Sequence, residues 1–415
     1  MPKIVILGGG FGGVRCALDL EHKIGQEAEI TLIDRNNNHF FTPSLYEVAS
    51  AYPEAVEDKF QMRLRRAVAV PYSEIFENKN IDIIEAEITG VDLDAKKITL
   101  DGGEHIEFDY LVLSLGSQSS DFGIPGVNEY AYRFKTTNDA ISLNQKMDRL
   151  FHEAASGLVQ LPVKILLIGA GFTGIELAAE LVSCATKISQ KHGLNRRSFS
   201  VTIFEAAPTI LPMVGDEERK TIVSRLTDLG VVIMTNSAIE EVRSDSVKLK
   251  SGQLMTGTIV VWTAGVRPNE LLSSIQGLPL TAHKRVQVDQ NLRVPGLDGV
   301  YALGDLAEFI DPKTQKPVPG LAYVAQHQGE VVADNIVASM RGKQAKTYHP
   351  DYESWIAPVG GKYAVAHINK GMTVSGVSGW LVRGVADLRY FKSILPLPKA
   401  LKLFTKDLLL FSKND

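Results

Sequence analysis

The amino-acid sequence predicts an α/β fold with two Rossmann-like dinucleotide-binding domains, the second inserted in the first, because one glycine motif occurs twice. The segment 3–13, an apolar run that leads into G-x-G-x-x-G, recurs 161 residues later at 164–174. The first glycine of such a motif makes the turn, the second lets the backbone approach a pyrophosphate, and the third packs the helix on the strand. Two copies, each between a strand pattern and a helix pattern, indicate two dinucleotides in one chain.

The first copy begins with a strand at 3–7 and a helix at 12–22, and its second strand covers 29–33. That strand ends at Asp34, which lies 21 residues past the third glycine. A carboxylate at this place can accept hydrogen bonds from a ribose diol. The alternative is a surface aspartate that only closes the strand. The glycines expected to cradle the pyrophosphate are Gly8, Gly10, Gly12 and Gly13.

The second copy repeats this plan with a strand at 163–168, a helix from about 172 to 191 and a strand at 199–204. Its acidic residue, Glu205, lies 31 residues past the third glycine, so the intervening helix or loop is longer. Glu205 should bind the adenine ribose hydroxyls, and its charge should repel the 2′-phosphate of NADPH. The sequence therefore predicts a strong preference for NADH. The glycines of this copy are Gly169, Gly171 and Gly174.

Several later strands end in glycine, where the backbone can approach a ligand closely. A buried apolar strand at 110–116 is mirrored at 259–265, and a third apolar run at 300–305 ends in Gly-Asp. Alternating segments near 81–99 predict a small antiparallel layer. The strand-end residues assigned to the nucleotide sites are Gly116, Gly265, Gly304 and Asp305.

The domain boundaries follow from these elements. The first dinucleotide-binding domain is expected to be discontinuous, formed by 1–120 and 285–344, and to end in a helix that follows Gly320. The second domain is expected at 155–284. The remainder, 345–415, is expected to form a third domain, with short strands followed by two cationic amphipathic stretches.

Composition excludes several classes of protein. With 45% hydrophobic and 22% charged residues and a net charge of −4, the chain is typical of globular proteins and gives no reason to expect nucleic acid as a partner. Its two cysteines, Cys16 and Cys184, lie in predicted helices and are interpreted as core residues; we expect no metal site. No apolar stretch approaches the roughly 20 residues of a membrane span. The first strand begins so early that no signal peptide is expected.

Three stretches carry a resemblance to a known family: Asp-Arg-Asn-Asn-Asn-His-Phe-Phe-Thr-Pro-Ser-Leu-Tyr-Glu-Val-Ala at 34–49, Gly-Phe-Thr-Gly-Ile-Glu-Leu-Ala-Ala-Glu-Leu at 171–181, and Thr-Ala-Gly-Val-Arg-Pro at 263–268. With the duplicated motif they resemble the two-dinucleotide-binding-domain flavoproteins of the glutathione-reductase-like fold. The closest likeness is to the type II NADH dehydrogenases. This resemblance implies non-covalent FAD in the first domain, NADH as substrate in the second, and hydride transfer followed by two-electron reduction of a membrane quinone, without proton pumping.

The resemblance also implies roles for single residues. Asp305 would hold the ribityl chain of FAD; a helix or turn cap after a strand is its structural alternative. A separate geometric hypothesis is that the helix after Gly320 directs its N-terminus at the flavin's pyrimidine edge. Glu176 matches a family glutamate that lies near flavin and quinone and is assigned to substrate positioning or proton handling. A glutamate in the first turn of a helix also complements the helix dipole, which is the structural alternative. The other positions placed near the flavin are Arg35, His39, Pro43 and Ala322.

The expected quinone motif is where this chain departs from the family. Type II enzymes show Ala-Gln-x-Ala-x-Gln, whereas residues 322–329 read Ala-Tyr-Val-Ala-Gln-His-Gln-Gly. Tyr323 and His327 therefore replace the two glutamines and can share a helix face. Tyrosine could cover a quinone ring, and histidine could bond its carbonyl and relay a proton. A packed aromatic residue and a core or capping histidine are the alternative. The predicted catalytic residues are Glu176, Tyr323 and His327.

The C-terminal stretches predict a peripheral membrane protein. From 380 onward seven Lys or Arg residues stand against three Asp, opposite in sign to the whole chain. Cationic amphipathic helices of this kind lie in the membrane interface, here the cytoplasmic face of the inner or cell membrane. A helix packed on the core or at a homodimer interface is the alternative. The expected apolar stripes are Trp380, Val385, Leu388, Phe391 and Leu395, then Leu401, Phe404, Leu408 and Phe411, with Lys399, Lys402 and Lys406 on another face.

Three other functions stay open. A sulfide:quinone oxidoreductase shares the fold but needs a reactive cysteine pair at the flavin. A soluble NADH-dependent reductase of a protein electron carrier would not need the cationic C-terminus. A nucleotide-sensing interaction protein would bind NADH without rapid turnover.

Overall fold

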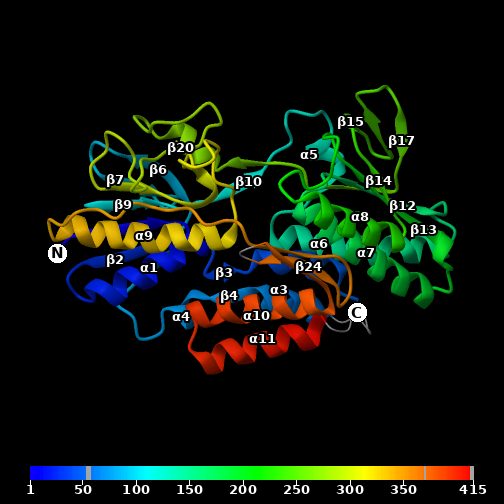
Figure 1. Ribbon diagram of the computed structural model, residues 1–415, viewed down its shortest axis with the longest axis horizontal. Coiled ribbons are helices and arrows are strands. Elements are labelled where there is room, and N and C mark those ends of the chain that lie inside the picture. Colours follow the sequence, from blue (N-terminus) through cyan, green and yellow to red (C-terminus); the bar gives the residue numbers. More distant parts are fainter. Residues whose placement is uncertain (53–57, 369–370, 412–415) are drawn as a thin grey trace. The chain divides into compact units, whose positions relative to one another are not determined.

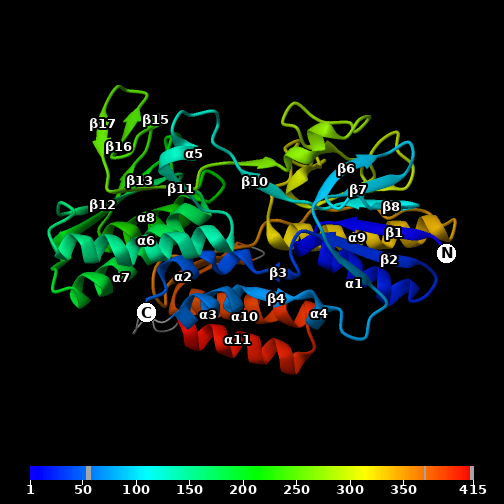
Figure 2. The same cartoon turned by 180° about the vertical axis from the view of Figure 1, so that it is seen from behind.

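The computed structural model describes residues 1–52, 58–368 and 371–411. The chain forms two compact units, here called unit 1 and unit 2 (Figures 1 and 2). Unit 1 consists of Met1–Phe40, Ala69–Gln118 and Val266–Tyr352, and unit 2 of Phe41–Val68, Ser119–Gly265 and Glu353–Asp415. The chain passes between them five times, two of them within β10 (Ser117–Ser119) and just before β19 (Val266–Pro268). Compactness does not identify a ligand, so the boundaries expected for the FAD and NADH domains stay a prediction.

Unit 1 is built on a parallel five-stranded sheet with the order β21-β9-β1-β2-β5. The central strand is buried along its apolar run, as expected for a parallel strand covered on both faces. The order places the strand that leads into Gly-Asp next to β9, which separates it from the strand of the first glycine motif. The strands are β1 (Lys3–Leu7), β2 (Glu29–Asp34), β5 (Asp82–Glu85), β9 (Tyr110–Leu113) and β21 (Val300–Ala302).

The antiparallel layer expected near 81–99 is shifted along the chain. The prediction was wrong for the first segment, because β5 pairs in parallel with β2 and belongs to the main sheet. The antiparallel layer is formed by β6 (Ile88–Asp92), β7 (Lys97–Leu100) and β8 (His105–Glu107). Ile98 and Leu100 pack into the same apolar core as the main sheet. The smaller elements of unit 1 are β3 (Asn38–Phe40), β4 (Ala69–Pro71), α4 (Tyr72–Ile75), β20 (Val286–Gln287), η4 (Gly304–Leu306) and β22 (Ala307–Glu308).

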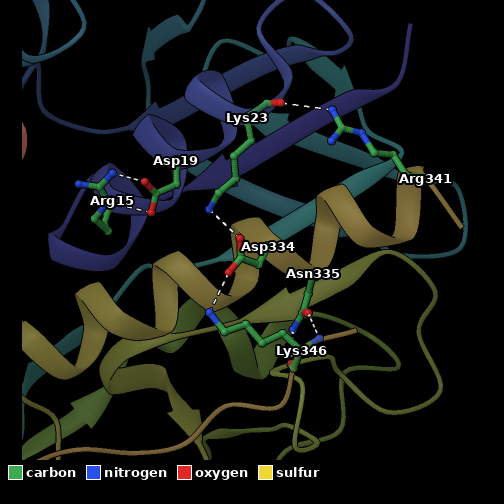
Figure 3. A network of polar contacts seen from close by, with 7 residues as sticks. All are labelled: Arg15, Asp19, Lys23, Asp334, Asn335, Arg341 and Lys346. Atoms are coloured by element: carbon green, nitrogen blue, oxygen red, sulfur yellow. Dashed lines mark hydrogen bonds and ion pairs between the residues drawn. The ribbon is translucent and has the colours of Figure 1, made fainter. Parts of the chain in front are cut away.

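Two long helices, α1 (Phe11–Ile24) and α9 (Ala322–Met340), lie side by side on unit 1. They approach closely because glycines face each other: a methyl group on Gly329 would lie 2.5 Å from the carbonyl oxygen of Gly12. Charged side chains join the two helices at the other end, as Figure 3 shows. Lys23 Nζ lies 2.7 Å from Asp334 Oδ1, and the second carboxylate oxygen of Asp334 pairs with Lys346. These contacts fix α9 against the helix that follows the first glycine motif.

Unit 2 is built on a second parallel sheet, with the order β11-β18-β12-β13-β14. The strand and helix predicted from the second motif are confirmed to the residue as β12 (Val163–Ile168) and α7 (Phe172–Lys191). The other strands are β11 (Ala131–Arg133), β13 (Phe199–Phe204), β14 (Val231–Met234) and β18 (Ile259–Trp262), and an antiparallel sheet follows in β15 (Ile239–Val242), β16 (Ser246–Leu249) and β17 (Leu254–Thr256). The remaining helices are α2 (Leu45–Ser50), α3 (Asp58–Val68), α5 (Val127–Tyr130), α6 (Thr137–Ala155) and α8 (Asp216–Asp228), with 3-10 turns η1 (Thr42–Ser44), η2 (Arg196–Ser198) and, in unit 1, η3 (Glu270–Ser274).

The C-terminal segment belongs to unit 2 and consists of three antiparallel strands and two helices. They are β23 (Trp355–Pro358), β24 (Ala364–Ile368), β25 (Met372–Gly376), α10 (Val377–Ile394) and α11 (Leu397–Phe411). The prediction of one membrane-facing apolar stripe on α10 was wrong in part, because Phe391 and Leu395 are buried in unit 2. The exposed apolar row is instead Val377, Leu381 and Val385. Within the described ranges, no helix combines the length and apolarity needed to cross a membrane.

Candidate dinucleotide and redox sites

The acidic residue of each motif holds the glycine loop in the same way in both units. In unit 1, Asp34 Oδ2 accepts the N–H of Gly9 at 2.7 Å, and Oδ1 accepts the N–H of Asn36 at 2.8 Å. In unit 2, Glu205 Oε2 accepts the N–H of Ala170 at 2.8 Å, and Oε1 accepts the N–H of Ala207 at 2.9 Å. The longer glutamate side chain thus makes the same pair of bonds. Each carboxylate is fixed at the end of its strand, where a ribose diol would meet it.

The first and third glycines of each motif are required by the backbone itself. Gly8 and Gly169 have φ of +100° and +106°, which disfavours any larger residue. A methyl group on Gly174 would lie 1.9 Å from the carbonyl oxygen of Gly169, and one on Gly13 would lie 2.0 Å from that of Gly8. Only glycine therefore lets each helix begin this close to its strand.

The second glycine of each motif is open instead of crowded. A methyl group on Gly10 or on Gly171 would have no atom of the described chain within 4 Å. The neighbouring helix starts leave backbone N–H groups available to an anion. An open glycine face beside a helix N-terminus fits the pyrophosphate of a dinucleotide in both units. By contrast, Gly12 is packed against Leu303 and the carbonyl of Ala325, so its role is to let α9 approach.

Each glycine loop is held by one hydroxyl residue that sequence reasoning missed. Ser114 Oγ lies 2.8 Å from the carbonyl oxygens of both Leu7 and Gly8. Thr263 Oγ1 lies 2.9 Å from that of Ile168 and 3.0 Å from that of Gly169. The available clue was that a hydroxyl residue occupies the same place in the two mirrored strands.

The Gly-Asp strand ends in a polar pocket of unit 1. Ser117 Oγ donates to Asp305 Oδ2 at 2.5 Å, and a methyl group on Gly320 would lie 2.6 Å from Asp305 Oδ1. Gly304 has a φ of +73°, and its N–H donates to Gln328 Oε1 at 2.7 Å. The pocket is lined by Arg285, Gly304, Asp305, Phe309, Pro319, Gly320 and Gln328, among others. The buried Gln328 was not singled out by the sequence, yet it fixes the turn that carries Asp305.

The remaining residues predicted near the flavin differ in their surroundings. Arg35 is exposed at the end of β2, and Ala322 begins α9. A methyl group on Gly116 would have no described atom within 4 Å, whereas one on its counterpart Gly265 would strike the ring of Phe122. Pro43 lies in the 3-10 turn η1 of unit 2.

His39 is part of the glycine loop of unit 1. It is 1% exposed, its Nδ1 lies 3.0 Å from the carbonyl oxygen of Gly9, and its ring meets Phe11 edge-on at 5.0 Å. Tyr72 donates to the same carbonyl at 2.9 Å. Burial lowers the pKa of His39 to about 4, so the imidazole is neutral near pH 7 and donates from Nδ1. The residue supports the loop backbone.

Tyr323 and His327 lie one helical turn apart on α9 but in different surroundings. Tyr323 is 36% exposed. His327 is partly buried, and its ring centroid lies 5.2 Å from that of Tyr348. Tyr348 in turn meets Phe309 edge-on at 4.9 Å. The structure thus gives His327 an aromatic neighbour and leaves Tyr323 nearer the surface.

Glu176 lies in the first turns of α7 and is partly buried. Desolvation raises the pKa of its carboxyl well above the usual range, and the negative charge of Asp387 on α10 raises that pKa further. Glu180, one turn on, is buried and accepts the N–H of Gly361 at 3.1 Å, which is a structural role. Burial beside the acidic side chain of Asp387 therefore favours the protonated form of Glu176.

Asp387 belongs to a cluster of unit 2 centred on Arg383, here called the Arg383 cluster. Arg383 Nη1 lies 2.7 Å from Glu47 Oε1, its Nε lies 3.3 Å from Asp387 Oδ2, and its Nη2 donates to Ser44 at 3.1 Å. The guanidinium also lies 5.0 Å from the ring centroid of Tyr46. These contacts join α10 to the 44–49 segment, which carries part of the family resemblance.

The two cysteines lie in the cores of the units. Cys16 and Cys184 are free and buried, and burial raises the pKa of both thiols, that of Cys184 to about 12. They are therefore unreactive as thiolates near neutral pH.

Comparisons with known proteins agree with this architecture. The family model described as pyridine nucleotide-disulphide oxidoreductase matches residues 2–329. The type II NADH:quinone oxidoreductase of Staphylococcus aureus is 31% identical over 398 residues, covering 93% of this chain and 94% of the relative. The enzyme of the same name from Staphylococcus saprophyticus is 29% identical with the same coverage.

Solved structures show the same fold. An NDH2 from Plasmodium falciparum, in complex with NADH, superposes with a TM-score of 0.85 at 18% identity, covering 98% of this chain and 97% of that one. A sulfide:quinone oxidoreductase from Aquifex aeolicus gives 0.78 at 20% identity, covering 98% and 92%. Fold and duplicated nucleotide sites define a flavoprotein of the pyridine nucleotide-disulphide oxidoreductase class. Within this class, the chain belongs to the type II NADH:quinone oxidoreductases.

Proposed function

We propose that this chain is an NADH:quinone oxidoreductase that binds FAD in unit 1 and NADH in unit 2. The observation that carries the proposal is the duplicated nucleotide geometry, in which Asp34 and Glu205 hold two open glycine loops by the same pair of hydrogen bonds. Unit 1 also has a Gly-Asp turn that lines a pocket. Two nucleotide sites of different construction support electron transfer between two different dinucleotides.

The residues of unit 1 fit FAD. Gly10 and the start of α1 offer an open anion site, Asp34 faces the ribose position, and Asp305 with Gly304 would hold the ribityl chain. The N-terminus of α9 would favour negative charge beside the flavin. Bound FAD would supply the two-electron chemistry that links NADH to quinone.

The residues of unit 2 favour NADH over NADPH. Both carboxylate oxygens of Glu205 accept backbone N–H groups, so a 2′-phosphate would meet an acidic side chain fixed in place. Glu205→Gln should weaken the discrimination, so kcat/KM for NADH divided by kcat/KM for NADPH should be lower in the variant than in the wild type. Equal kcat/KM for the two nucleotides in the wild type would contradict the assignment.

Quinone reduction takes up two protons, and Glu176 is proposed to supply or relay one of them. Desolvation raises the pKa of this carboxyl, which favours the protonated form that a proton donor needs. Tyr323 and His327 are proposed to contact the quinone head group, in place of the glutamines of the family. Substrate positioning by Glu176 without proton transfer is the alternative.

One assay separates the candidate functions. Steady-state NADH oxidation by the FAD-loaded enzyme would be measured with menaquinone, ubiquinone and plastoquinone analogues, for the wild type and for Glu176→Gln. We expect rapid turnover with at least one quinone and a loss of 10-fold or more in kcat for the variant. Two parallel assays replace the quinone by a protein electron carrier, or replace NADH by sulfide as the electron donor. Turnover in either of these and none with NADH and quinone would refute the proposal, and NADH binding without turnover would indicate a sensor.

Peripheral membrane docking is proposed for α10 and α11. Exposed apolar side chains follow one face of α10 through Leu381 and Val385, which are 56% and 69% exposed, and α11 adds Leu409 at 70%. Basic residues such as Lys402 and Lys406 are exposed beside them. This combination suits the interface of an anionic membrane, expected to be the cytoplasmic face of the cell membrane.

Point substitutions test docking better than truncation, because Phe391 and Phe411 of the same helices are buried in unit 2. The triple variant Leu381→Gln, Val385→Gln, Leu409→Gln should lose sedimentation with anionic liposomes and keep NADH oxidation by a soluble quinone analogue. Unchanged sedimentation would contradict the assignment. A homodimer stays a prediction that mass photometry can test.

A further inference from the structure

Segment 263–265 follows β18, at the edge of the unit 2 sheet where a nucleotide is expected. In a parallel α/β sheet the ligand binds beyond the carboxyl ends of the strands, at the point where the strand order reverses. In the order β11-β18-β12-β13-β14 this point lies between β12 and β18. Thr263 bonds the carbonyl oxygen of Gly169, and a methyl group on Gly169 would lie 2.9 Å from the α-carbon of Ala264. The segment after β18 therefore stands directly beside the glycine loop.

The ring of Phe122 lies on this segment. A methyl group on Gly265 would be only 2.1 Å from Cζ of Phe122, so the ring rests on the α-carbon of Gly265. The equivalent glycine of unit 1, Gly116, has no described atom at this place. At this glycine the two units thus differ by one aromatic ring.

Phe122 occupies a position that is unfavourable for a phenylalanine. Its side chain is 64% exposed, and its φ is +51°, in the left-handed region that bulky residues avoid. The surrounding loop is nevertheless held in place. Trp262 Nε1 donates to the carbonyl oxygen of Ser120 at 2.7 Å, and Asn128 donates to Asp121 at 2.6 Å. Strain and an exposed apolar surface, both held by specific bonds, are typical of a ligand contact.

We infer that Phe122 is a positioning residue for the dinucleotide of unit 2, with the Cζ end of its ring at Gly265 and its exposed surface available to pack against a planar ring of NADH. The inference rests on the proposed function, because it assigns the nucleotide to unit 2. Its consequence is that this contact contributes to nucleotide affinity and not to quinone chemistry.

The test measures NAD⁺ binding to the oxidised, FAD-loaded enzyme by titration calorimetry. Phe122→Ala and Phe122→Gly should each weaken NAD⁺ binding about 10-fold, which corresponds to about 1.4 kcal/mol. Phe122→Tyr keeps the ring and should bind as the wild type does. Leu254→Ala, on the distant edge strand β17 and 50% exposed, is the matched control for loss of an exposed apolar side chain. In steady state, KM for NADH should rise while kcat at saturating NADH stays unchanged.

The glycine variant separates positioning from structural packing. Glycine adopts a φ of +51° freely, so Phe122→Gly should keep or raise the melting temperature while it loses nucleotide affinity. Wild-type affinity in both Phe122→Ala and Phe122→Gly would overturn the inference. A parallel loss of affinity and melting temperature in Phe122→Gly would also overturn it, since that result indicates structural packing. The titration involves no quinone, so a wild type that binds NAD⁺ without reducing quinone would refute the proposed function alone.

Discussion

Replacing Arg383 by glutamine should destabilise unit 2 and loosen α10. The substitution removes the ion pairs to Glu47 and Asp387, the bond to Ser44 and the packing on Tyr46. It also leaves two carboxylates in a site where their side chains are only 19% and 21% exposed, without a counter-charge. The loss therefore exceeds that of a surface ion pair.

The magnitude follows from this partial burial. An exposed ion pair contributes up to about 1 kcal/mol, and breaking a fully buried pair costs about 3–5 kcal/mol. With a guanidinium that is 11% exposed, the Arg383 cluster lies between these limits, so we expect a loss of about 2–3 kcal/mol. For a unit of roughly 240 residues this corresponds to a melting temperature about 5–10 °C lower.

The measurement is differential scanning calorimetry of the FAD-loaded enzyme, combined with hydrogen exchange of the α10 amides. Arg389→Gln is the matched control, because it removes the same charge from an exposed position of the same helix and should change stability by less than about 0.5 kcal/mol. Arg383→Lys keeps the charge without the planar fork and should fall between the two. Equal melting temperatures and equal exchange for Arg383→Gln and Arg389→Gln would refute the reasoning.

Three further predictions concern the site residues. Asp387→Asn removes a negative charge that raises the pKa of Glu176, so that pKa should be lower in the variant. The alkaline limit of flavin reoxidation by quinone should then move to lower pH in stopped-flow measurements. An unmoved limit would count against an effect of Asp387 on Glu176. In the folded protein His39 has a pKa of about 4, so the free energy of unfolding should decrease by about 2–3 kcal/mol between pH 6.5 and pH 4.5. Urea unfolding at the two pH values should show a smaller decrease for His39→Asn. Gly174→Ala should lower the melting temperature, because the new methyl group would lie 1.9 Å from the carbonyl oxygen of Gly169. Gly171→Ala has open space around the methyl group, so it should keep the melting temperature and weaken NAD⁺ binding. Equal melting temperatures for the two variants would contradict the different roles assigned to the two glycines.

Much of the local structure could be predicted because its causes are contiguous in the chain. The strand 163–168 and the helix 172–191 coincide with β12 and α7, since an apolar run, a glycine turn and a helical pattern follow one another without interruption. Glu205 was predicted from its place at the end of a strand, and its bonds to Ala170 and Ala207 fix its carboxylate beside the glycine loop. Its contact with NADH stays a prediction.

Side-chain partners distant in the chain could not be predicted. Arg383 was interpreted only as one charge of an amphipathic helix, and nothing in its neighbourhood points to Glu47, which precedes it by more than 300 residues. For the same reason Phe391 was placed on a membrane-facing stripe, although α10 turns it into the core of unit 2. An amphipathic pattern states that one face is buried, and it does not state against what.

The sequence by itself determined that this protein has two nucleotide loops, which acid belongs to each, and which family the chain resembles, because each of these properties depends on residues that are adjacent or one strand apart. Only the tertiary structure decided that Asp387 acts on Glu176, that Arg383 joins α10 to the 44–49 segment, and that Phe122 covers Gly265. The physical reason is that burial and electrostatic coupling depend on distance in space. Folding sets that distance, and the separation of two residues in the sequence does not reveal it.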